Sequence, residues 1–361
     1  MAQVPLHEHH VSLGAKFGPF GGWQMPIEYS AGTIAEHHAV RNQVGLFDVS
    51  HMGKIRVSGK GAKKYVNTIF TNDLNRIVPG QAQYSMLCNE TGGIIDDLIV
   101  YLEGEDEIRI IPNASNAQAV VSVLREFAPE AIIVEDLHLT HGIIAVQGPK
   151  SRDLISLLDL PGDMEYMEFK DVVWRQQVVS VCRTGYTGEH GYELVASNEA
   201  VIRLWEELLN NGEDLGLLAC GLGARDTLRT EMGYVLHGQD ISEDISALQA
   251  RTSWAIGWEK ENFLGKSVLE EQKAIGPKNL AWGLLAIDRG IPRAHMSVTN
   301  SEGDVVGETT SGTFSPTLQK GIALALLNPG YGQGDVLNVD VRGRALRVEV
   351  VRPPFVDSSP K

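Results

Sequence analysis

Two adjacent carboxylates, Asp96 and Asp97, lie within an apolar run that follows a Gly-Gly pair. The run is rich in β-branched residues and the glycines favour a turn, so residues 94–101 are predicted to form a strand covered on both faces. Because side chains alternate along a strand, Asp97 shares one face with Tyr101 while Asp96 occupies the other. A buried carboxylate must be paired, hydrogen-bonded, shifted in pKa or open to a ligand cavity.

Two interpretations of this carboxylate pair remain open from the residues alone. In the structural one, both groups are held by nearby backbone N–H groups or by an arginine. In the functional one, at least one of them binds a ligand or moves a proton. Two neighbouring carboxylates that face opposite ways favour a function for at least one of them.

A second group of chemically capable residues lies in the stretch 182–194, where three glycines are interleaved with Tyr186, Glu189, His190, Tyr192 and Glu193. The pattern predicts a loop that places aromatic and acidic groups against a ligand. No Gly-Lys-Ser/Thr sequence follows, so it is not a phosphate-binding loop.

The stretch 221–226 begins a predicted helix, and it lacks the third glycine of a dinucleotide-binding fingerprint. Arg225 and Arg229 are four residues apart and therefore share one face of that helix. They suit binding to carboxylates or to a carbonyl group. The alternative is a ladder of surface ion pairs.

Other polar clusters point less clearly to chemistry. His7, Glu8, His9 and His10 do not follow the HExxH pattern, so no metal site is expected there and a solvated helix start is the simpler interpretation. Ser50 and His51 are adjacent in a predicted strand and turn, which points their side chains apart and gives no support for a catalytic triad.

Composition excludes several classes of protein. The 361 residues are 43% hydrophobic and 21% charged, as in ordinary globular proteins of two or three domains, and no apolar run is long enough to cross a membrane. A net charge of −15 argues against nucleic-acid binding. Three dispersed cysteines and no basic-apolar leader predict reduced thiols in the cytoplasm.

The elements that must position these residues can be read along the chain. Strands around 83–87 and 94–102 form a predicted hairpin, and a strand at 108–111 ends in the polar cluster Pro112–Asn116 before a helix at 117–127. Such strand-to-helix junctions often carry ligand contacts. A glycine-rich aromatic loop is expected at 17–23, and helices at 33–43 and 199–210.

After residue 278 the pattern changes to short alternating strands with glycine turns, which predicts an all-β module, either a sandwich or a barrel. Basic residues gather in this module and, against the acidic background of the chain, form a candidate docking patch or merely a solvated surface. They are Arg289, Arg293, Lys320, Arg342, Arg344, Arg347 and Arg352.

Taken together, these stretches resemble the glycine cleavage system T-protein family of tetrahydrofolate-dependent aminomethyltransferases. The matching segments run in family order over nearly the whole chain. They are FGGWQMP at 20–26, GLFDVSHMG at 45–53, GGIIDDL at 92–98, RTGYTGE at 183–189, GARDTLRTE at 223–231 and TSGTFSPT at 310–317.

The resemblance implies an α+β protein with three domains arranged like a clover leaf around a folate channel. The first domain is discontinuous and comprises 1–54, 110–137 and 224–274, and the second comprises 55–109 and 138–223 and is interleaved with it. Both contain antiparallel sheets. Residues 275–361 form the third, a β-barrel-like domain.

The resemblance also implies the reaction. The aminomethyl group on the lipoyl arm of H protein moves to tetrahydrofolate, which gives 5,10-methylenetetrahydrofolate, ammonia and a dihydrolipoyl arm, without a metal. Carried over by position, Asp97 is the catalytic residue near folate N5. The positions that line or support the pterin pocket are Met52, Tyr84, Tyr101, Asn113, Tyr186, Glu193, Arg225 and Tyr234.

Two alternatives remain beside this interpretation. A folate-dependent demethylase-like module would need a flavin domain ahead of it, for which the sequence offers no candidate. A non-catalytic folate-binding protein would carry a Lys-Gly-Cys-Tyr signature where this chain has Arg183-Thr184-Gly185-Tyr186. Ala247, Gln249 and His295 depart from the family pattern, so fine details of the channel and of H-protein docking stay open.

Overall fold

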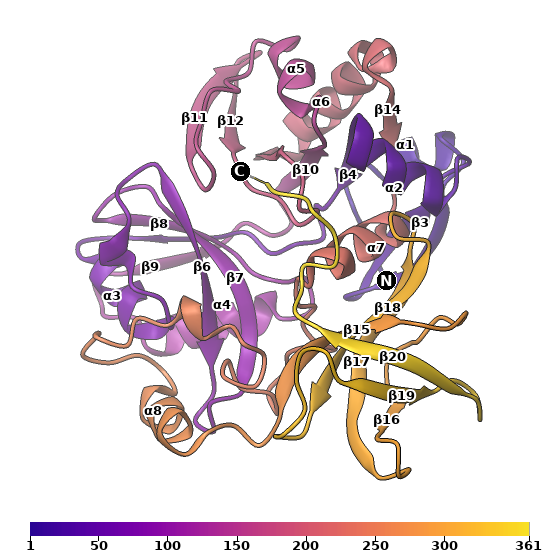
Figure 1. Cartoon of the computed structure of the whole chain (residues 1–361). Coiled ribbons are helices and arrows are strands. Elements are labelled where there is room, and N and C mark those ends of the chain that lie inside the picture. The colour runs from indigo at the N-terminus through magenta and orange to yellow at the C-terminus, as the bar shows by residue number, and fades with distance from the viewer. Residues whose placement is uncertain (361) are drawn as a thin grey trace. The chain divides into compact units, whose positions relative to one another are not determined.

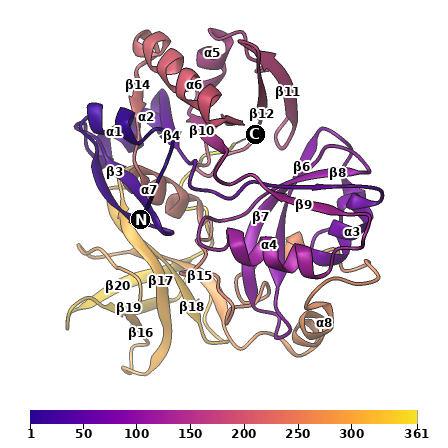
Figure 2. The same cartoon turned by 180° about the vertical axis from the view of Figure 1, so that it is seen from behind.

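The computed structural model describes residues Met1–Pro360, which form two compact units (Figures 1 and 2). The first unit comprises Met1–Leu87 and Asp96–Arg225, together with Ser359 and Pro360. The second comprises Cys88–Ile95 and Asp226–Ser358. The α+β class expected from the sequence is confirmed.

The first unit contains a six-stranded sheet in the order β11-β12-β13-β10-β4-β14, antiparallel except where β14 runs parallel to β4. Helices α5 and α6 pack on it, and the apolar side of α6 buries Val201, Leu204, Trp205 and Leu208. The bounds are β4 Val44–Asp48, β10 His141–Gln147, β11 Phe169–Trp174, β12 Gln177–Cys182, β13 Gly191–Ser197, β14 Leu217–Ala219, α5 Ser151–Ser156 and α6 Asn198–Asn211.

A five-stranded sheet in the order β6-β7-β8-β5-β9 holds the carboxylate pair. The predicted hairpin is confirmed as β6 and β7, and helices α3 and α4 pack beside β8, β5 and β9 (Figure 2). The bounds are β5 Ile55–Ser58, β6 Gln81–Cys88, β7 Ile94–Leu102, β8 Glu107–Ile111, β9 Ile133–Asp136, α3 Ala62–Ile69 and α4 Ala117–Glu126.

The stretch 17–23, expected as a loop, is instead a β-hairpin. Strand β2 (Lys16–Phe20) pairs with β3 (Trp23–Glu28), and Phe20 lies opposite Trp23. Gly21 and Gly22 form the two-residue turn with φ of 55° and 85°, a conformation that glycine adopts without a Cβ penalty. Strand β1 (Ala2–Gln3) completes this three-stranded sheet, and helix α2 (Thr33–Asn42) follows it.

The prediction of a solvated helix start for the first histidine cluster is wrong in part. Helix α1 (His7–Ser12) forms, but His10 is fully buried. Its Nε2 lies 2.8 Å from Asp48 Oδ2 and its Nδ1 lies 2.9 Å from the hydroxyl of Tyr29. Within Met1–Pro360, no group of three or more His, Cys, Asp or Glu residues could hold a metal ion. The two hydrogen bonds hold the buried His10 ring against Asp48 and Tyr29.

In the second unit, the all-β module resolves as a closed six-stranded antiparallel barrel around an apolar core. Its bounds are β15 Leu280–Ala286, β16 Ser297–Thr299, β17 Val305–Ser315, β18 Lys320–Leu327, β19 Val336–Asp340 and β20 Ala345–Val351. Helix α8 (Lys266–Ile275) precedes it. Helix α7 (Leu222–Met232) begins in the first unit, which includes it up to Arg225, and continues from Asp226 in the second unit. The remaining short helices are 3-10 turns at Leu74–Arg76, Glu213–Leu215 and Ser253–Ala255.

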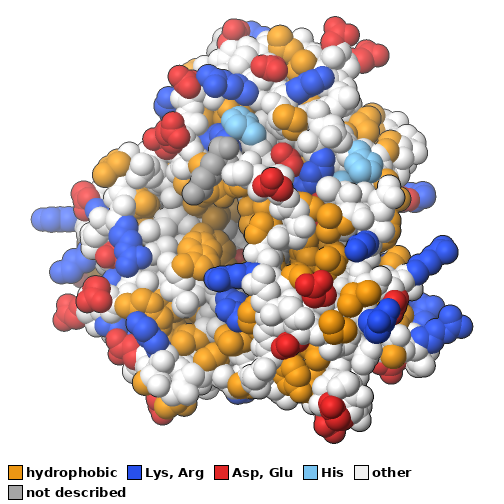
Figure 3. Space-filling model, in the orientation of Figure 1, with side chains coloured by type: hydrophobic (Ala, Val, Ile, Leu, Met, Phe, Trp, Pro, Cys, Tyr) orange, Lys and Arg blue, Asp and Glu red, His pale blue; other side chains and the backbone are white. Residues whose placement is uncertain are grey.

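The charged side chains on the surface reflect the charged composition of the sequence. Acidic side chains are spread over the face shown in Figure 3, interspersed with Lys and Arg. No helix among residues 1–360 combines the length and the apolar character needed to cross a bilayer. The three cysteines are buried and free, as their spacing predicts.

A buried ion pair ties α7 to the barrel inside the second unit. Asp240 Oδ2 accepts hydrogen bonds from Arg229 Nη1 at 2.7 Å and Ser311 Oγ at 2.9 Å, and its Oδ1 accepts one from Thr310 Oγ1 at 2.5 Å. Arg229 is therefore part of a buried network and not of a surface ladder.

Replacing Asp240 with Ala leaves the Arg229 charge buried without this carboxylate. We expect a loss of about 3–5 kcal/mol in the free energy of unfolding, the usual effect of removing one partner of a buried pair. Urea denaturation measures this loss, with the exposed Glu302→Gln as a control expected to change stability by less than about 0.5 kcal/mol. A similarly small change for Asp240→Ala would show that the network does not stabilise this unit.

Candidate active site

Asp97 lies in β7 on the half-buried face, and Asp96 beside it is fully buried. The alternation of buried and half-buried residues along β7 confirms the predicted faces. Asp97 Oδ2 accepts a hydrogen bond from the hydroxyl of Tyr84 at 3.1 Å, and Asp97 Oδ1 accepts one from Asn113 Nδ2 at 2.8 Å. Three of the residues predicted for the site are therefore in direct contact.

The sheet register explains why Asn113 meets Asp97. Strands β7 and β8 pair antiparallel, with Tyr101 opposite Arg109 and Ile99 opposite Ile111. Continued by two residues, back from Ile99 and onward from Ile111, the same register places Asp97 opposite Asn113. The polar cluster after β8 thus lies against the carboxylates of β7.

The protonation of these groups follows from burial and charge. Burial, and then the charge of Asp97, raise the pKa of Tyr84 well above its ordinary value, so the phenol stays protonated and can donate. Burial, and then the charge of Asp97, also raise the pKa of Asp96 to about 8. Hydrogen bonds from Asn116 and Asn113 oppose that rise.

A second carboxylate, Glu193 in β13, is held by a chain of hydroxyls. Thr184 Oγ1 donates to Glu193 Oε2 at 2.6 Å, and the hydroxyl of Tyr101 lies 3.3 Å from Thr184 Oγ1. The ring of Tyr101 is fully buried, with the guanidinium of Arg109 at 5.3 Å and the ring of Phe169 at 5.4 Å. Tyr101 therefore supports Glu193 and does not present its ring face to a ligand.

Arg225, at the start of α7, lies over the ring of Tyr186 at 4.7 Å. Its Nη1 is buried and makes no hydrogen bond with any residue of the described chain. Desolvation lowers the pKa of this guanidinium, and the charge of Glu193 acts against that change. The loop at 182–194 and the helix start at 221–226 are thus brought together.

The two remaining predicted residues are placed as follows. Met52 is half-buried in the turn after β4, where its N–H donates to Val49 O at 3.0 Å. Next to it, Gly53 donates its N–H to Pro112 O at 2.9 Å, which fixes this turn against the segment that carries Asn113. Tyr234 belongs to the second unit, just after α7, where its N–H donates to Arg229 O at 2.9 Å.

Sequence reasoning missed three polar residues of this region. Asn116 donates from Nδ2 to Asp96 Oδ1 at 2.7 Å, and Thr184 bridges Tyr101 and Glu193. His51 is buried, and its Nδ1 makes no hydrogen bond with the rest of the described chain. Burial, and then the charge of Arg225, lower the pKa of His51 to about 3, so its ring is neutral. Only Asn116 had a signal, its place in the polar cluster.

This arrangement can bind a flat, nitrogen-rich ligand with both donors and acceptors. Glu193 can accept two neighbouring N–H groups in a bidentate pair, while Arg225 can donate to a ring carbonyl. Asp97, held by a neutral phenol and an amide, can orient an N–H group, take its proton or stabilise nearby positive charge.

Comparisons with known proteins agree with this chemistry. A family model described as the GCVT N-terminal domain matches residues 6–260, and one described as the glycine cleavage T-protein C-terminal barrel domain matches 282–357. An aminomethyltransferase of Parafrankia sp. is 55% identical over 100% of this chain and 99% of that protein. One of Mycobacterium avium is 55% identical over 98% of this chain and 96% of that protein.

A solved structure is also similar along the whole chain. The glycine cleavage system aminomethyltransferase T of Bartonella henselae aligns with a TM-score of 0.93 at 33% identity and covers 99% of both chains.

Proposed function

The chain belongs to the glycine cleavage T-protein family and is an aminomethyltransferase, and from that premise we propose that tetrahydrofolate binds in its first unit with N5 beside Asp97. The donor is then the aminomethyl group carried by a lipoylated H protein. The observation that carries the proposal is the half-buried Asp97 carboxylate, which is held by Tyr84 and Asn113 on the open face of β7.

The proposed reaction needs no oxidant. The C–N bond of the S–CH₂–NH₂ group breaks and ammonia leaves. N5 attacks the carbon, the C–S bond breaks, and N10 closes the five-membered ring. The two protons lost from N5 and N10 are matched by one gained in ammonia and one gained by the sulfur, so the lipoyl arm leaves as a dithiol.

Asp97 serves this sequence in either of two ways. Its negative charge stabilises the positive charge that develops as ammonia departs, or it accepts the proton from N5. Both require an ionised carboxylate close to the reacting carbon. The hydrogen bonds from Tyr84 and Asn113 stabilise that form, because a carboxylate accepts them and a carboxylic acid accepts fewer.

The pterin would be recognised at Glu193 and Arg225. Its 2-amino group and N3–H lie side by side and suit the two oxygens of one carboxylate. The Tyr186 ring, which Arg225 covers on one face, offers a stacking surface to the pterin. Arg225 has a buried N–H group with no hydrogen-bond partner in the described chain, and a carbonyl group of the pterin ring would satisfy it.

One assay separates this proposal from a folate-binding protein without activity. Purified enzyme is mixed with tetrahydrofolate and with H protein that has been reduced and loaded with formaldehyde and ammonia. Formation of 5,10-methylenetetrahydrofolate with release of ammonia supports the transferase. Folate binding without turnover would support the non-catalytic alternative.

We also propose that the reaction takes place in the cytoplasm, in keeping with three free thiols.

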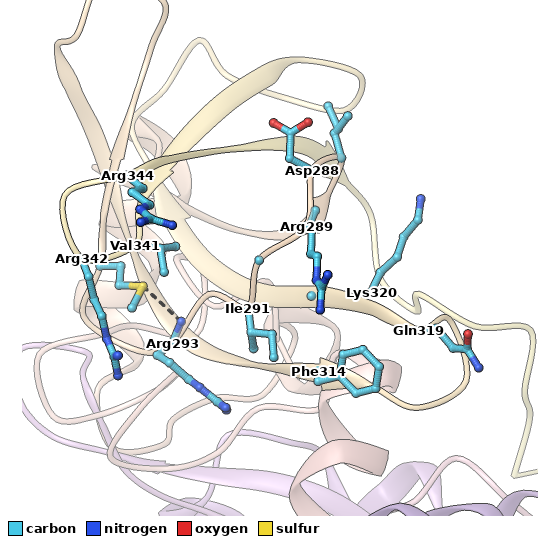
Figure 4. Close-up of a pocket in the computed structure, with 15 residues that line it drawn as sticks. Asp288, Arg289, Ile291, Arg293, Phe314, Gln319, Lys320, Val341, Arg342 and Arg344 are labelled. Atoms are coloured by element: carbon cyan, nitrogen blue, oxygen red, sulfur yellow. Dashed lines mark hydrogen bonds between the residues drawn. The ribbon is translucent and has the colours of Figure 1, made fainter.

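For H protein we propose a docking surface on the barrel of the second unit. Five cations line a hollow of about 910 Å³, and Figure 4 shows their side chains around it. They are Arg289, Arg293, Lys320, Arg342 and Arg344, and we call them the basic rim.

The basic rim is not neutralised by the protein itself. None of its five cations pairs with a carboxylate of residues 1–360, and the one lining acid, Asp288, is held by Arg347 through two hydrogen bonds of 2.9 and 2.8 Å. Residues 277–357 contain eight Lys or Arg and eight Asp or Glu, so the whole excess of 15 negative charges lies elsewhere. All five cations are exposed on flexible side chains, which suits an acidic protein surface better than an enclosed small ligand.

The double variant Arg289→Glu/Arg342→Glu is expected to raise the KM for H protein roughly tenfold or more at low salt, because like charges now meet. The kcat at saturation and the affinity for tetrahydrofolate should not change. Raising the ionic strength should shrink the difference. The matched control is Lys60→Glu/Lys64→Glu, which makes the same charge change at exposed positions of the first unit. Equal KM values for the two double variants would remove the barrel from the docking surface.

A further inference from the structure

Asp96, the other carboxylate of β7, is fully buried and has no part in the proposed function so far. Its two oxygens accept three hydrogen bonds from the segment between β8 and α4. Oδ1 accepts from Asn113 Nδ2 at 2.9 Å and from Asn116 Nδ2 at 2.7 Å, and Oδ2 accepts from the backbone N–H of Asn113 at 3.0 Å.

These contacts fix which way the Asn113 amide points. Its Nδ2 faces three oxygens, namely Asp96 Oδ1 at 2.9 Å, Asp97 O at 2.8 Å and Asp97 Oδ1 at 2.8 Å. Turning the amide by 180° would place its oxygen against all three of them, which is repulsive. The amide therefore donates to both carboxylates, and its Oδ1 is turned the other way.

The opposite end of the amide is left for a ligand. Asn113 is half-buried, and its Oδ1 accepts no hydrogen bond from any residue between 1 and 360. On the other side, the bond from Nδ2 restrains Asp97 Oδ1, while Tyr84 restrains Asp97 Oδ2. The direction of both groups thus depends on the buried carboxylate behind them.

We propose that Asp96 is a positioning residue for the transfer: it holds the Asn113 amide and, through that amide, the Asp97 carboxylate, without touching the substrate. The inference rests on the proposed function, because it assigns Asp97 to the reaction. Among the charged and titratable groups, Asp97 on the same strand and Tyr84 on β6 face Asp96, and the side chains from the segment before α4 are neutral amides.

A purely structural role does not explain why the group is a carboxylate. Burial away from water and the charge of Asp97 both disfavour the ionised form of a carboxyl group at this position. That disadvantage is visible in the pKa of Asp96, which burial and the charge of Asp97 raise to about 8. Local strain of this kind is typical of functional sites.

Two variants of Asp96 test the proposal. In Asp96→Ala the Asn113 amide loses the carboxyl group that holds it, so the Asp97 carboxylate is no longer held in place. We expect kcat to fall about 100-fold, while the Kd for tetrahydrofolate changes less than about threefold. In Asp96→Asn one amide oxygen can still accept from both side chains, so kcat should recover to within about tenfold of the wild type.

The pH dependence supplies a readout that a packing defect would not move. Burial and the charge of Asp97 raise the pKa of Asp96 to about 8, so Asp96 ionises only above neutral pH and should give the wild type a basic limb in its kcat–pH profile. Neither variant has a group that titrates at position 96, so this limb should shift to higher pH in both. The isosteric Asp96→Asn reports this shift even where Asp96→Ala does not fold, as judged by its circular dichroism and melting curve.

The outcomes are distinguishable. A wild-type enzyme that does not turn over loaded H protein overturns the proposed function and this inference together. An active wild type, with Asp96→Asn unchanged in its pH profile, overturns the inference alone. An active wild type with a folded Asp96→Ala of normal kcat does the same.

Discussion

The Asp97→Asn variant is expected to bind tetrahydrofolate normally and to lose turnover with loaded H protein by about a thousandfold or more, as for removal of a charge that acts in the transition state. The substitution keeps the size of the side chain. Tyr84 can still donate to the amide oxygen, so the local structure and the pterin pocket should survive. The variant removes the negative charge, the ability to take a proton and the hydrogen bond that Asn113 Nδ2 donates to Asp97 Oδ1.

Single-turnover kinetics and titration calorimetry measure the two halves of this expectation. Asp214→Asn is a suitable control, because it makes the same chemical change at an exposed position without a described contact and should leave both quantities unchanged. Turnover like that of the wild type in Asp97→Asn would exclude the role assigned to Asp97. Loss of folate binding in that variant would mean that Asp97 binds the substrate in its ground state.

The features of this site that could be predicted were those encoded locally. The alternation around Asp96 and Asp97 gave the correct strand and the correct faces, because a strand has a period of two. The glycine turns and alternating residues after 278 likewise predicted an all-β module. They did not decide between a sandwich and a barrel, because closing the barrel pairs its first and last strands, β15 and β20, across about seventy residues.

The features that could not be predicted depend on distant pairing. Asn113 contacts both carboxylates because the register of β7 and β8 places it there, and the register is a property of two strands together. His10 is buried only because Asp48 and Tyr29, far away in sequence, offer it hydrogen bonds on both ring nitrogens. Its own neighbours, two histidines and a glutamate, suggested a solvated helix.

The resemblance to a family located Tyr101 without explaining it. Its position in the family pattern assigned it to line or support the pterin pocket, and its aromatic side chain suggested that it packs against the pterin ring. Its ring is instead covered by Arg109 and Phe169, and its hydroxyl reaches Thr184. We therefore interpret Tyr101 as the far end of the hydrogen-bond chain that orients Glu193, the residue that we propose recognises the pterin.

The Glu193→Ala variant should accordingly bind tetrahydrofolate about 100-fold more weakly, since about 2–3 kcal/mol is typical when a charged hydrogen-bond acceptor is lost from a buried pair. Its loss leaves the neighbouring Arg225 charge less well compensated, which adds to the effect. The kcat at saturating folate should fall much less, because Asp97 and its partners are unchanged.

Thr184→Val separates orientation from recognition at the same carboxylate. The variant keeps the shape of the side chain and removes the hydroxyl that donates to Glu193 Oε2 at 2.6 Å. We expect folate affinity to fall by about three- to tenfold, the effect of one hydrogen bond. Calorimetry with tetrahydrofolate measures both variants, with Glu199→Gln on the exposed side of α6 as the control. If Glu193→Ala binds folate as tightly as the wild type, the pterin lies elsewhere, and the buried N–H of Arg225 must be satisfied by another ligand group.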